Sequence, residues 1–463
     1  MISSVAWVRR GVAKPQRPKF EQQEEELAAM RAEAEEAEAE ESDEEMQPVE
    51  GDMADIVKKY NMDDYDNESD AFSFLVPPEV ERMRSGEKDP YLTEGPMDDD
   101  SDDEIDAINL QPNDAILVAA TTEEDQFSHL NVYVYEEQEN NLYIHHDVVL
   151  AEFPLCVEWM HYAPPVEDEE ASVPGSSNFV AVGTFSEAIE VWNLDLIDVM
   201  HPTLTLGGKE EVPAVDMSNA TPNAKKRMKK KQKKKALNAS LKEGSHSAAV
   251  MCLSWNQGIS NVLASGSADH TAKLWDLNTG NCLLTFPHHQ DKVQVCEWHP
   301  VETNVLLTGS YDKTVAVVDA KNPASLHRFP ITADIESAAW NPHRPSEFLA
   351  STEDGLVTCY DILRPDKPLW TLNAHNDSVT SMSINQVFPG CLATVSVDKA
   401  VKIWDIGEGR PSLVYSNENF TTPLFAVRWN VDFPYLLSVG GKNELQVIDT
   451  VQLAAVRDSY RPQ

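Results

Sequence analysis

The sequence has few basic residues, few cysteines and no long apolar run. Its 463 residues include no stretch of 18 consecutive apolar residues, so we expect no transmembrane helix and no membrane partner. The basic first 20 residues lack the apolar run of a secretory signal, and we expect no such signal. The six cysteines are scattered without a Cys-x-x-Cys pair, which argues against zinc ribbons and disulfide scaffolds and favours a reducing compartment.

Motifs of common catalytic sites are also missing. The sequence has no glycine-rich phosphate loop, no Gly-x-Ser-x-Gly and no His-Glu-x-x-His. Two short histidine-containing runs, at 145–147 and 288–291, hold metal-binding residue types, but the second matches a structural position of the repeat described below. We therefore predict that the chain is not an enzyme and has no cofactor, no metal and no small-molecule substrate.

Charge is unevenly distributed along the chain. Asp and Glu total 78 against 37 Lys and Arg, a net charge of −41. Residues 1–20 carry five bases and no acid, whereas residues 21–106 carry 33 acids and 6 bases, hence −27. Such a segment cannot bury enough apolar surface to offset its chain entropy. We predict a basic motif at 1–20, a mostly disordered acidic arm at 21–104 and a folded domain at 105–463.

The folded domain contains a repeat of 42 to 45 residues. One landmark residue recurs at the end of an apolar stretch, and a second, usually Trp-Asp or a relative, follows 20 or 21 residues later. A phrase such as Leu263-Ala-Ser-Gly-Ser-Ala-Asp lies between them. The first landmark is Trp255, Trp298, Trp340, Ile384 and Trp429 in turn.

Three phrases in fixed order at this period resemble the WD40 family, which implies one four-stranded propeller blade for each repeat. Two further repeats lie upstream, one around Trp159 and a more degenerate one at 115–135. We therefore predict an all-β fold, a seven-bladed WD40 β-propeller with a disordered acidic N-terminal arm. We expect the last blade to form its own outer strand at Leu453–Val456. Whether Ile2–Val8 adds a strand that closes the ring stays open.

The resemblance also implies a hydrogen-bond network within a blade, between a His, a strand hydroxyl, a turn Asp and the Trp of Trp-Asp. His289 and Asp312 fit the same pattern, but Val318 stands where the Trp would be, which predicts an incomplete network there. The histidines recur nine residues before each first landmark, which favours a structural role. The complete sets are His246, Ser265, Asp269 and Trp275, and His375, Thr394, Asp398 and Trp404.

A tryptophan at the first landmark is unusual for a WD40 repeat and resembles the periodic tryptophan protein 1 family. The N-terminal Met1-Ile-Ser-Ser-Val-Ala-Trp-Val-Arg-Arg and the later Val57-Lys-Lys-Tyr-Asn-Met-Asp-Asp-Tyr-Asp strengthen this resemblance. It implies a non-catalytic scaffold in nucleolar ribosome biogenesis, in pre-rRNA processing and large-subunit assembly, with rRNA transcription as a further option. It also implies a location in the nucleus and nucleolus, with ribosome assembly factors and pre-ribosomal particles as partners.

An insertion between the second and third blades, 207–244, carries a lysine-rich run. Nine of the eleven residues from 225 to 235 are basic, and this run predicts nuclear import, RNA contact or simple pairing with the acidic arm. No aromatic residue is interleaved, so any RNA contact should not be sequence-specific. The nine basic residues are Lys225, Lys226, Arg227, Lys229, Lys230, Lys231, Lys233, Lys234 and Lys235.

The acidic arm resembles nucleic acid electrostatically, which predicts basic partners such as ribosomal proteins or histones. Ser42 and Ser101 lie in acidic runs and are candidates for phosphorylation. Isolated apolar residues in such regions either dock a partner or fold back on the parent domain; here they are Trp7, Tyr60, Phe72 and Phe74.

Two other function classes are compatible with these features. The alternative we favour next is a chromatin- or histone-binding propeller that regulates transcription. A ubiquitin-ligase adaptor is less favoured, because the Trp-Asp-x-Arg-like run at 360–364 has one residue too many.

Overall fold

The computed structural model describes residues 1–13, 110, 114–122, 128–137, 140–162, 177–197, 199–210, 240–407 and 409–460. Contacts divide the chain into two units, Met1–Lys19 with Leu110–Gln463, and Phe20–Asn109. All described residues belong to the first unit. Most of the predicted arm and the centre of the lysine-rich insertion lie outside them.

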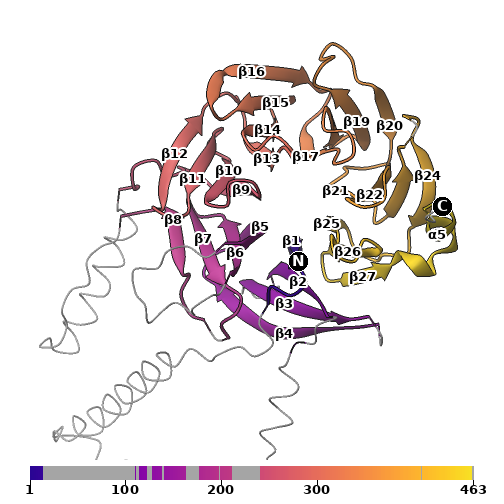
Figure 1. Cartoon of the computed structure of the whole chain (residues 1–463), viewed down its shortest axis with the longest axis horizontal. Helices are drawn as coiled ribbons and strands as arrows, with labels where there is room; N and C mark the ends of the chain where they lie inside the picture. The colour runs from indigo at the N-terminus through magenta and orange to yellow at the C-terminus, as the bar shows by residue number, and fades with distance from the viewer. Residues whose placement is uncertain are drawn as a thin grey trace, which may run out of the picture. The chain divides into compact units, whose positions relative to one another are not determined.

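The described chain forms seven antiparallel sheets arranged as a ring, which confirms the predicted propeller (Figure 1). Each blade runs from an inner strand beside the central axis to an outer strand at the rim. Six blades have four strands and the seventh has three. Blade 1 is β1 (Ile2–Trp7), β2 (Ala115–Thr122), β3 (Ser128–Glu136) and β4 (Asn141–Leu150); blade 2 is β5 (Pro154–His161), β6 (Asn178–Thr184), β7 (Ala188–Asn193) and β8 (Leu204–Gly207). Blade 3 is β9 (Val250–Trp255), β10 (Val262–Ser267), β11 (Ala272–Asp276) and β12 (Asn281–Phe286); blade 4 is β13 (Val293–Trp298), β14 (Val305–Ser310), β15 (Thr314–Asp319) and β16 (Asn322–Pro330). Blade 5 is β17 (Ile335–Trp340), β18 (Glu347–Thr352), β19 (Leu356–Asp361) and β20 (Trp370–Asn373); blade 6 is β21 (Ser381–Ile384), β22 (Cys391–Val395), β23 (Val401–Asp405) and β24 (Ser412–Asn417); blade 7 is β25 (Leu424–Trp429), β26 (Leu436–Gly441) and β27 (Leu445–Asp449).

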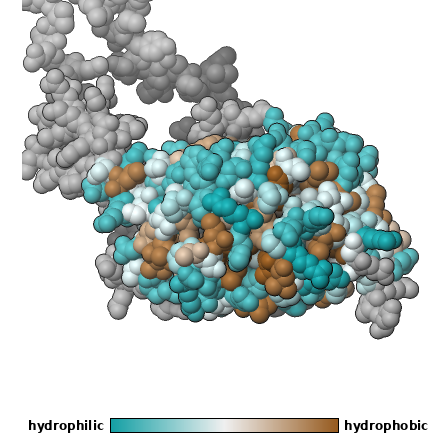
Figure 2. Space-filling model, turned by 90° about the horizontal axis from the view of Figure 1, so that it is seen from above, coloured by the Kyte–Doolittle hydropathy of each residue, from teal (hydrophilic) through white to brown (hydrophobic). Residues whose placement is uncertain are grey.

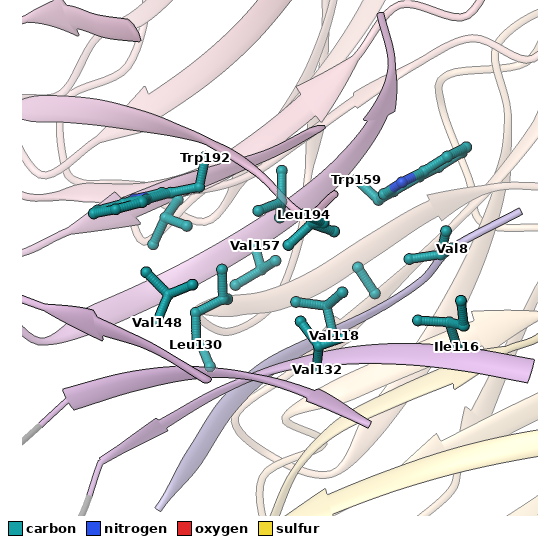
Figure 3. Packing of buried hydrophobic residues seen from close by; sticks show 14 of the residues in the cluster. Val8, Ile116, Val118, Leu130, Val132, Val148, Val157, Trp159, Trp192 and Leu194 are labelled. Carbon is teal, nitrogen blue, oxygen red and sulfur yellow. The ribbon is translucent and has the colours of Figure 1, made fainter. Parts of the chain in front are cut away.

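The core lies between neighbouring blades, because each sheet is covered on both faces. Second strands such as β6 are therefore buried at every residue, whereas outer strands such as β12 are largely exposed. Between blades 1 and 2, Trp159 and Trp192 pack against valines and leucines of blade 1 (Figure 3). On the rim seen in Figure 2, apolar side chains are interspersed with polar ones.

The inner strand of blade 1 comes from the N-terminus, about one hundred residues before the rest of its blade. β1 pairs with β2, from Ile2 opposite Thr121 to Trp7 opposite Leu117. This settles the open question about Ile2–Val8 and revises the expected domain start at residue 105. Residues 14–109 therefore connect two adjacent strands of blade 1 and do not precede the propeller.

The C-terminal expectation was wrong. Leu453–Val456 form no outer strand; a short 3₁₀ helix, η3 (Thr450–Gln452), leads into a helix, α5 (Ala454–Ser459). The apolar residues Leu453, Val456 and Tyr460 recur at helical spacing and pack against blade 6. Among the described residues, blade 7 therefore ends at its third strand.

The antiparallel order of each blade places its turns on two faces of the ring. Turns between first and second strands, where the landmark tryptophans lie, share one face with the turns between third and fourth strands; we call it the Trp face. The inter-blade connections, which carry His246, His289 and His375, share the opposite His face with the turns between second and third strands. The connection formed by residues 14–109 therefore starts and ends on the Trp face of the propeller, whereas the lysine-rich insertion begins on the His face.

Contacts that join the blades and candidate interaction surfaces

The structure brings each complete set of four network residues together. His246 Nδ1 lies 2.9 Å from Asp269 Oδ2, and its Nε2 lies 2.7 Å from Ser265 Oγ. The Trp275 indole N–H donates to the same hydroxyl at 2.8 Å. Burial lowers the pKa of His246, so the ring is neutral at neutral pH. Burial acts to raise the pKa of Asp269, but hydrogen bonds from His246 and Thr271 outweigh it and hold that pKa low.

Blade 6 repeats this geometry. His375 Nδ1 lies 3.0 Å from Asp398 Oδ2, and its Nε2 lies 2.8 Å from Thr394 Oγ1. The Trp404 indole N–H donates to Thr394 Oγ1 at 3.0 Å. All three network histidines, here and in blade 4, have fully buried side chains and bind protein groups, which is what a structural role requires.

In blade 4, a second histidine contacts the strand hydroxyl that the tryptophan contacts in blades 3 and 6. His289 contacts Asp312 and Thr308 as expected, and Val318 offers no donor. The neighbouring His288 places its Nε2 2.8 Å from Thr308 Oγ1. Burial, with His289 and Arg328 nearby, lowers the pKa of His288 to about 3. This partner was not identified from the sequence, although the adjacent His-His pair was the available signal.

Two of the landmark tryptophans, Trp298 and Trp340, also bond neighbouring blades to each other. The Trp298 indole N–H donates to the Ser254 carbonyl at 3.1 Å, and that of Trp340 donates to the Glu297 carbonyl at 3.2 Å. In both cases the acceptor is the residue before the landmark tryptophan of the preceding blade. Each inner strand has one edge without a ladder partner, and these bonds satisfy part of it.

Trp7 makes the same bond across the point where the ring closes. Its indole N–H donates to the Arg428 carbonyl at 3.1 Å, and Arg428 precedes Trp429 in blade 7. Ile2 packs against Gly440 of blade 7, where an added Cβ would lie 2.8 Å from Ile2 Cγ2. Trp7 is half-buried within this contact. Of the two alternatives for Trp7, the structure shows the one in which it folds onto the parent domain.

Charged residues strengthen the same junction. Arg9 Nη1 lies 3.2 Å from Asp432 Oδ1, and the Arg10 backbone N–H donates to Asp432 Oδ2 at 2.7 Å. The Arg10 guanidinium lies over the ring of Phe433, 5.5 Å from its centroid. Arg9 and Arg10 of the basic N-terminal motif therefore make specific contacts with the first turn of blade 7.

Two glutamates on inner strands accept backbone N–H groups from the next blade. Glu297 Oε2 accepts from the Trp340 N–H at 2.8 Å, and Glu158 Oε1 accepts from the Trp255 N–H at 3.3 Å. Arg428 Nη2 lies 3.6 Å from Glu158 Oε2 and so links blades 7 and 2. Burial raises the pKa of Glu297 to about 7, although the Trp340 N–H and Arg428 act in the opposite direction.

This raised pKa predicts a pH-dependent effect of Glu297→Gln. The pKa of Glu297 is higher when folded than the value of about 4.3 for a free side chain, so its contribution to stability is largest below pH ~4.3 and falls as pH rises through 7. Gln keeps an oxygen for the Trp340 N–H and carries no charge. We expect the variant to be more stable by about 1–3 kcal/mol at pH 8, with no gain at pH 4.5, as measured by urea unfolding. An equal gain at both pH values would contradict this prediction.

The insertion and a surface cavity meet on the His face. Lys209 pairs with Leu241 in an antiparallel bridge, so the insertion begins and ends side by side. A cavity of about 340 Å³ next to this stem is lined by Glu152, Phe185, Glu187 and Lys209 among others. Phe185 is 57% exposed and contacts the ring of Phe153. The cavity therefore combines an exposed aromatic side chain with carboxylates and with Lys209, whose Nζ lies 4.0 Å from Glu187 Oε1.

The remaining predicted site residues lie outside the described part of the chain. They are Lys225, Lys226, Arg227, Lys229, Lys230, Lys231, Lys233, Lys234, Lys235, Ser42, Ser101, Tyr60, Phe72 and Phe74. Within the described residues, no group of three or more His, Cys, Asp or Glu could hold a metal ion. No helix in that part of the chain is long and apolar enough to span a membrane.

The fold and its repeated contacts define a WD-repeat β-propeller, a class that typically provides a non-catalytic scaffold for protein interactions. The WD domain, G-beta repeat family matches residues 238–276, 280–319 and 366–405. An uncharacterized WD repeat-containing protein of Schizosaccharomyces pombe is 39% identical over 417 residues, covering 88% of this chain and 76% of that protein.

Two relatives carry a more specific name. Periodic tryptophan protein 1 of Saccharomyces cerevisiae is 30% identical over 539 aligned positions, covering 100% of this chain and 90% of the yeast protein. The periodic tryptophan protein 1 homolog of Drosophila melanogaster is 28% identical, covering 83% of this chain and 75% of that protein. The chain belongs to the periodic tryptophan protein 1 family, as the landmark tryptophans predicted.

Proposed function

We propose that this propeller is a non-catalytic scaffold for ribosome biogenesis in the nucleolus, acting in pre-rRNA processing and large-subunit assembly. The observation that carries the proposal is the placement of two oppositely charged segments. The acidic stretch, −27 over residues 21–106, is connected to the Trp face, and the insertion with nine basic residues is connected to the His face. A particle that contains both basic proteins and RNA offers a partner of opposite charge to each segment.

The ring supplies the rigidity that a scaffold needs. The tryptophan and glutamate contacts between blades fix the two points at which these segments begin. Both segments act through long-range attraction, which salt screens over about 8 Å, so lasting binding must come from ordered surfaces such as the cavity near Phe185.

Co-purification of the full chain tests this proposal. The tag belongs at the C-terminus, because the Met1 amine bonds to the Thr122 carbonyl and Ile2 is buried. We expect large-subunit precursor particles to co-sediment with the protein in a gradient. Recovery of nucleosomes in their place would favour the chromatin-binding alternative, and recovery of neither would contradict both.

The lysine-rich run has a separate test. Replacing its nine basic residues by Gln should leave the propeller folded, because Glu210 and Ser240 close the stem without it. We expect nuclear accumulation and affinity for RNA to fall. A variant with every Lys of the run changed to Arg keeps the charge and should behave like the parent. Unchanged nucleolar concentration of the Gln variant would show that import depends on another segment or on a partner.

A further inference from the structure

The outer edge of β27 in blade 7 is open. Six blades carry a fourth strand antiparallel to the third, but among the described residues no strand pairs with this edge of β27 (Figure 1). The chain after β27 leads to blade 6, where the Tyr460 hydroxyl donates to the Trp404 carbonyl at 3.3 Å. The outer backbone N–H and C=O groups of β27 can therefore pair with an added strand.

The side chains of β27 are more exposed than those of other third strands. The central residues of β15 and β19, the third strands of blades 4 and 5, are buried. In β27, by contrast, Leu445, Val447 and Ile448 are only half-buried. These apolar side chains occupy the positions of core residues but lack the cover that a fourth strand gives in the other blades.

Apolar side chains of both neighbouring blades flank this edge. On one face of β27, Val447 lies in a cluster with Tyr133 of blade 1. On the other face, Ile448 lies in a cluster with Tyr415 of β24 in blade 6. Ile144 of β4 is the cross-strand partner of Tyr133 and is 52% exposed, so it lies on the face of blade 1 that is turned toward blade 7. A strand added beside β27 would bury apolar side chains on both of its faces.

The open edge has room for one strand. Blade 7 lies between blades 6 and 1, whose fourth strands, β24 and β4, extend further from the axis than β27 (Figure 1). A second copy of the propeller would bring its own flanking blades, and β24 and β4 would keep these away from β27. The fourth strands β20 and β24 have four and six residues, which sets the length of the site. The shape therefore favours a single extended segment.

Negative charge lies at the Trp-face end of the edge. Asp449 is the last residue of β27, and Glu137 follows β3 of blade 1. The Tyr435 hydroxyl donates to Glu137 Oε1 at 2.8 Å. Burial raises the pKa of Tyr135, and the nearby carboxylates of Asp449 and Glu137 raise it further. Within the described residues, neither carboxylate forms an ion pair with a Lys or Arg, so the end of the edge is complementary to a basic residue.

We propose that the outer edge of β27 binds an extended apolar segment of a partner protein, with a Lys or Arg at its N-terminal end, as the fourth strand of blade 7. Backbone pairing holds the segment, the walls of blades 1 and 6 select apolar side chains, and the two carboxylates select the basic residue. Blade 6 supplies the register, because Asp405 at the end of β23 pairs with Ser412, the first residue of β24. The basic residue of the bound segment takes the place of Ser412, opposite Asp449. The proposal does not depend on the role in ribosome biogenesis.

A synthetic peptide with the sequence of β24 tests the proposal on the full chain. The probe is Ser412–Asn417 with Ser412→Lys, labelled at its C-terminus, and its binding is followed by fluorescence anisotropy. Ile144→Asp should weaken binding at least ~10-fold, because it places a charge in the apolar wall. Leu283→Asp is the matched control, since Leu283 is 51% exposed on the fourth strand of blade 3, and should change nothing. Equal affinity of the parent and Ile144→Asp would overturn the proposal.

The basic end of the segment has its own test. The Lys peptide should bind the parent protein about 2–5-fold more tightly than the unchanged β24 peptide, the range for an exposed ion pair. Glu137→Gln keeps an acceptor for the Tyr435 hydroxyl but removes the charge, so it should reduce this preference. High salt should reduce it as well. A preference of equal size in the parent and in Glu137→Gln would contradict the proposal.

Hydrogen exchange locates the bound peptide. A saturating amount of the Lys peptide should slow exchange at the amides of Leu445–Ile448 and leave β15 unchanged, because the outer edge of β15 is already paired with β16. Unchanged exchange of β27 under saturation would show that the peptide binds elsewhere and would overturn the proposal. Sedimentation of the free chain should show a monomer. A dimer that is lost in Ile144→Asp would assign the edge to a second copy and contradict the proposal.

Discussion

Deleting residues 1–8 is expected to prevent stable folding of the propeller. The deletion removes the inner strand of blade 1, including the buried Ile2, Val5 and Val8, and it leaves blade 7 without its neighbour. Burying one such side chain stabilises a protein by about 1.5–3 kcal/mol, so the total loss is on the order of 5–8 kcal/mol. Domains are usually stable by only about 5–15 kcal/mol. Soluble yield and denaturant unfolding would measure the loss.

A peptide of residues 1–13 provides the control for this deletion. Supplied in excess to the truncated chain, it should restore part of the stability, because Trp7, Arg9 and Arg10 would again contact blade 7. A peptide with Trp7→Ala should be less effective. The view that β1 closes the ring would be wrong if the truncated chain unfolded at the same denaturant concentration as the full chain.

Trp298→Ala should cost about 3–5 kcal/mol of unfolding free energy, the range for removing a large buried aromatic side chain. The side chain is 8% exposed and packs between blades 3 and 4. The substitution also leaves the Ser254 carbonyl without its indole donor. Urea unfolding followed by circular dichroism would measure the change. A loss under about 1 kcal/mol would identify Trp298 as a surface residue.

Two variants separate the causes of this loss. Trp298→Phe keeps most of the apolar volume and removes the hydrogen bond to Ser254. Beyond the effect of the smaller side chain, the lost hydrogen bond should lower the unfolding free energy by only about 0.5–1.5 kcal/mol. Trp255 occupies the same position of blade 3, but it is half-buried and its indole N–H donates within its own turn, to the Ser260 carbonyl at 2.8 Å. Trp255→Ala should therefore be less destabilising than Trp298→Ala.

Periodicity predicted the fold well wherever a repeat is contiguous in sequence. The landmarks at Trp255, Trp298 and Trp340 mark the ends of inner strands, and the residues of two predicted networks lie within hydrogen-bond distance of each other. These features are local, because each blade is a meander of about forty residues. A single sequence therefore contains most of the information needed to locate them.

Features that join distant segments were harder to predict. Ile2-Ser-Ser-Val-Ala-Trp7 has the same final tryptophan as the other inner strands, but the remainder of its blade begins at Ala115. The pairing of Glu158 with Arg428 appears only once the ring is closed. At the C-terminus, the apolar residues of Leu453–Val456 were interpreted as a strand. Two alanines and the i, i+3 spacing of Leu453 and Val456 instead favour the helix that forms.

The N-terminal origin of β1 has a consequence for biosynthesis. Trp7 is among the first residues to be translated, but its acceptor on Arg428 follows 421 residues later. Translation proceeds at about 5–20 residues per second, so ~20–85 s separate the synthesis of the two halves of this contact. During that interval the apolar strand has no completed ring to join. Nascent chains of this protein are therefore expected to need a chaperone that shields the first eight residues until blade 7 has been made.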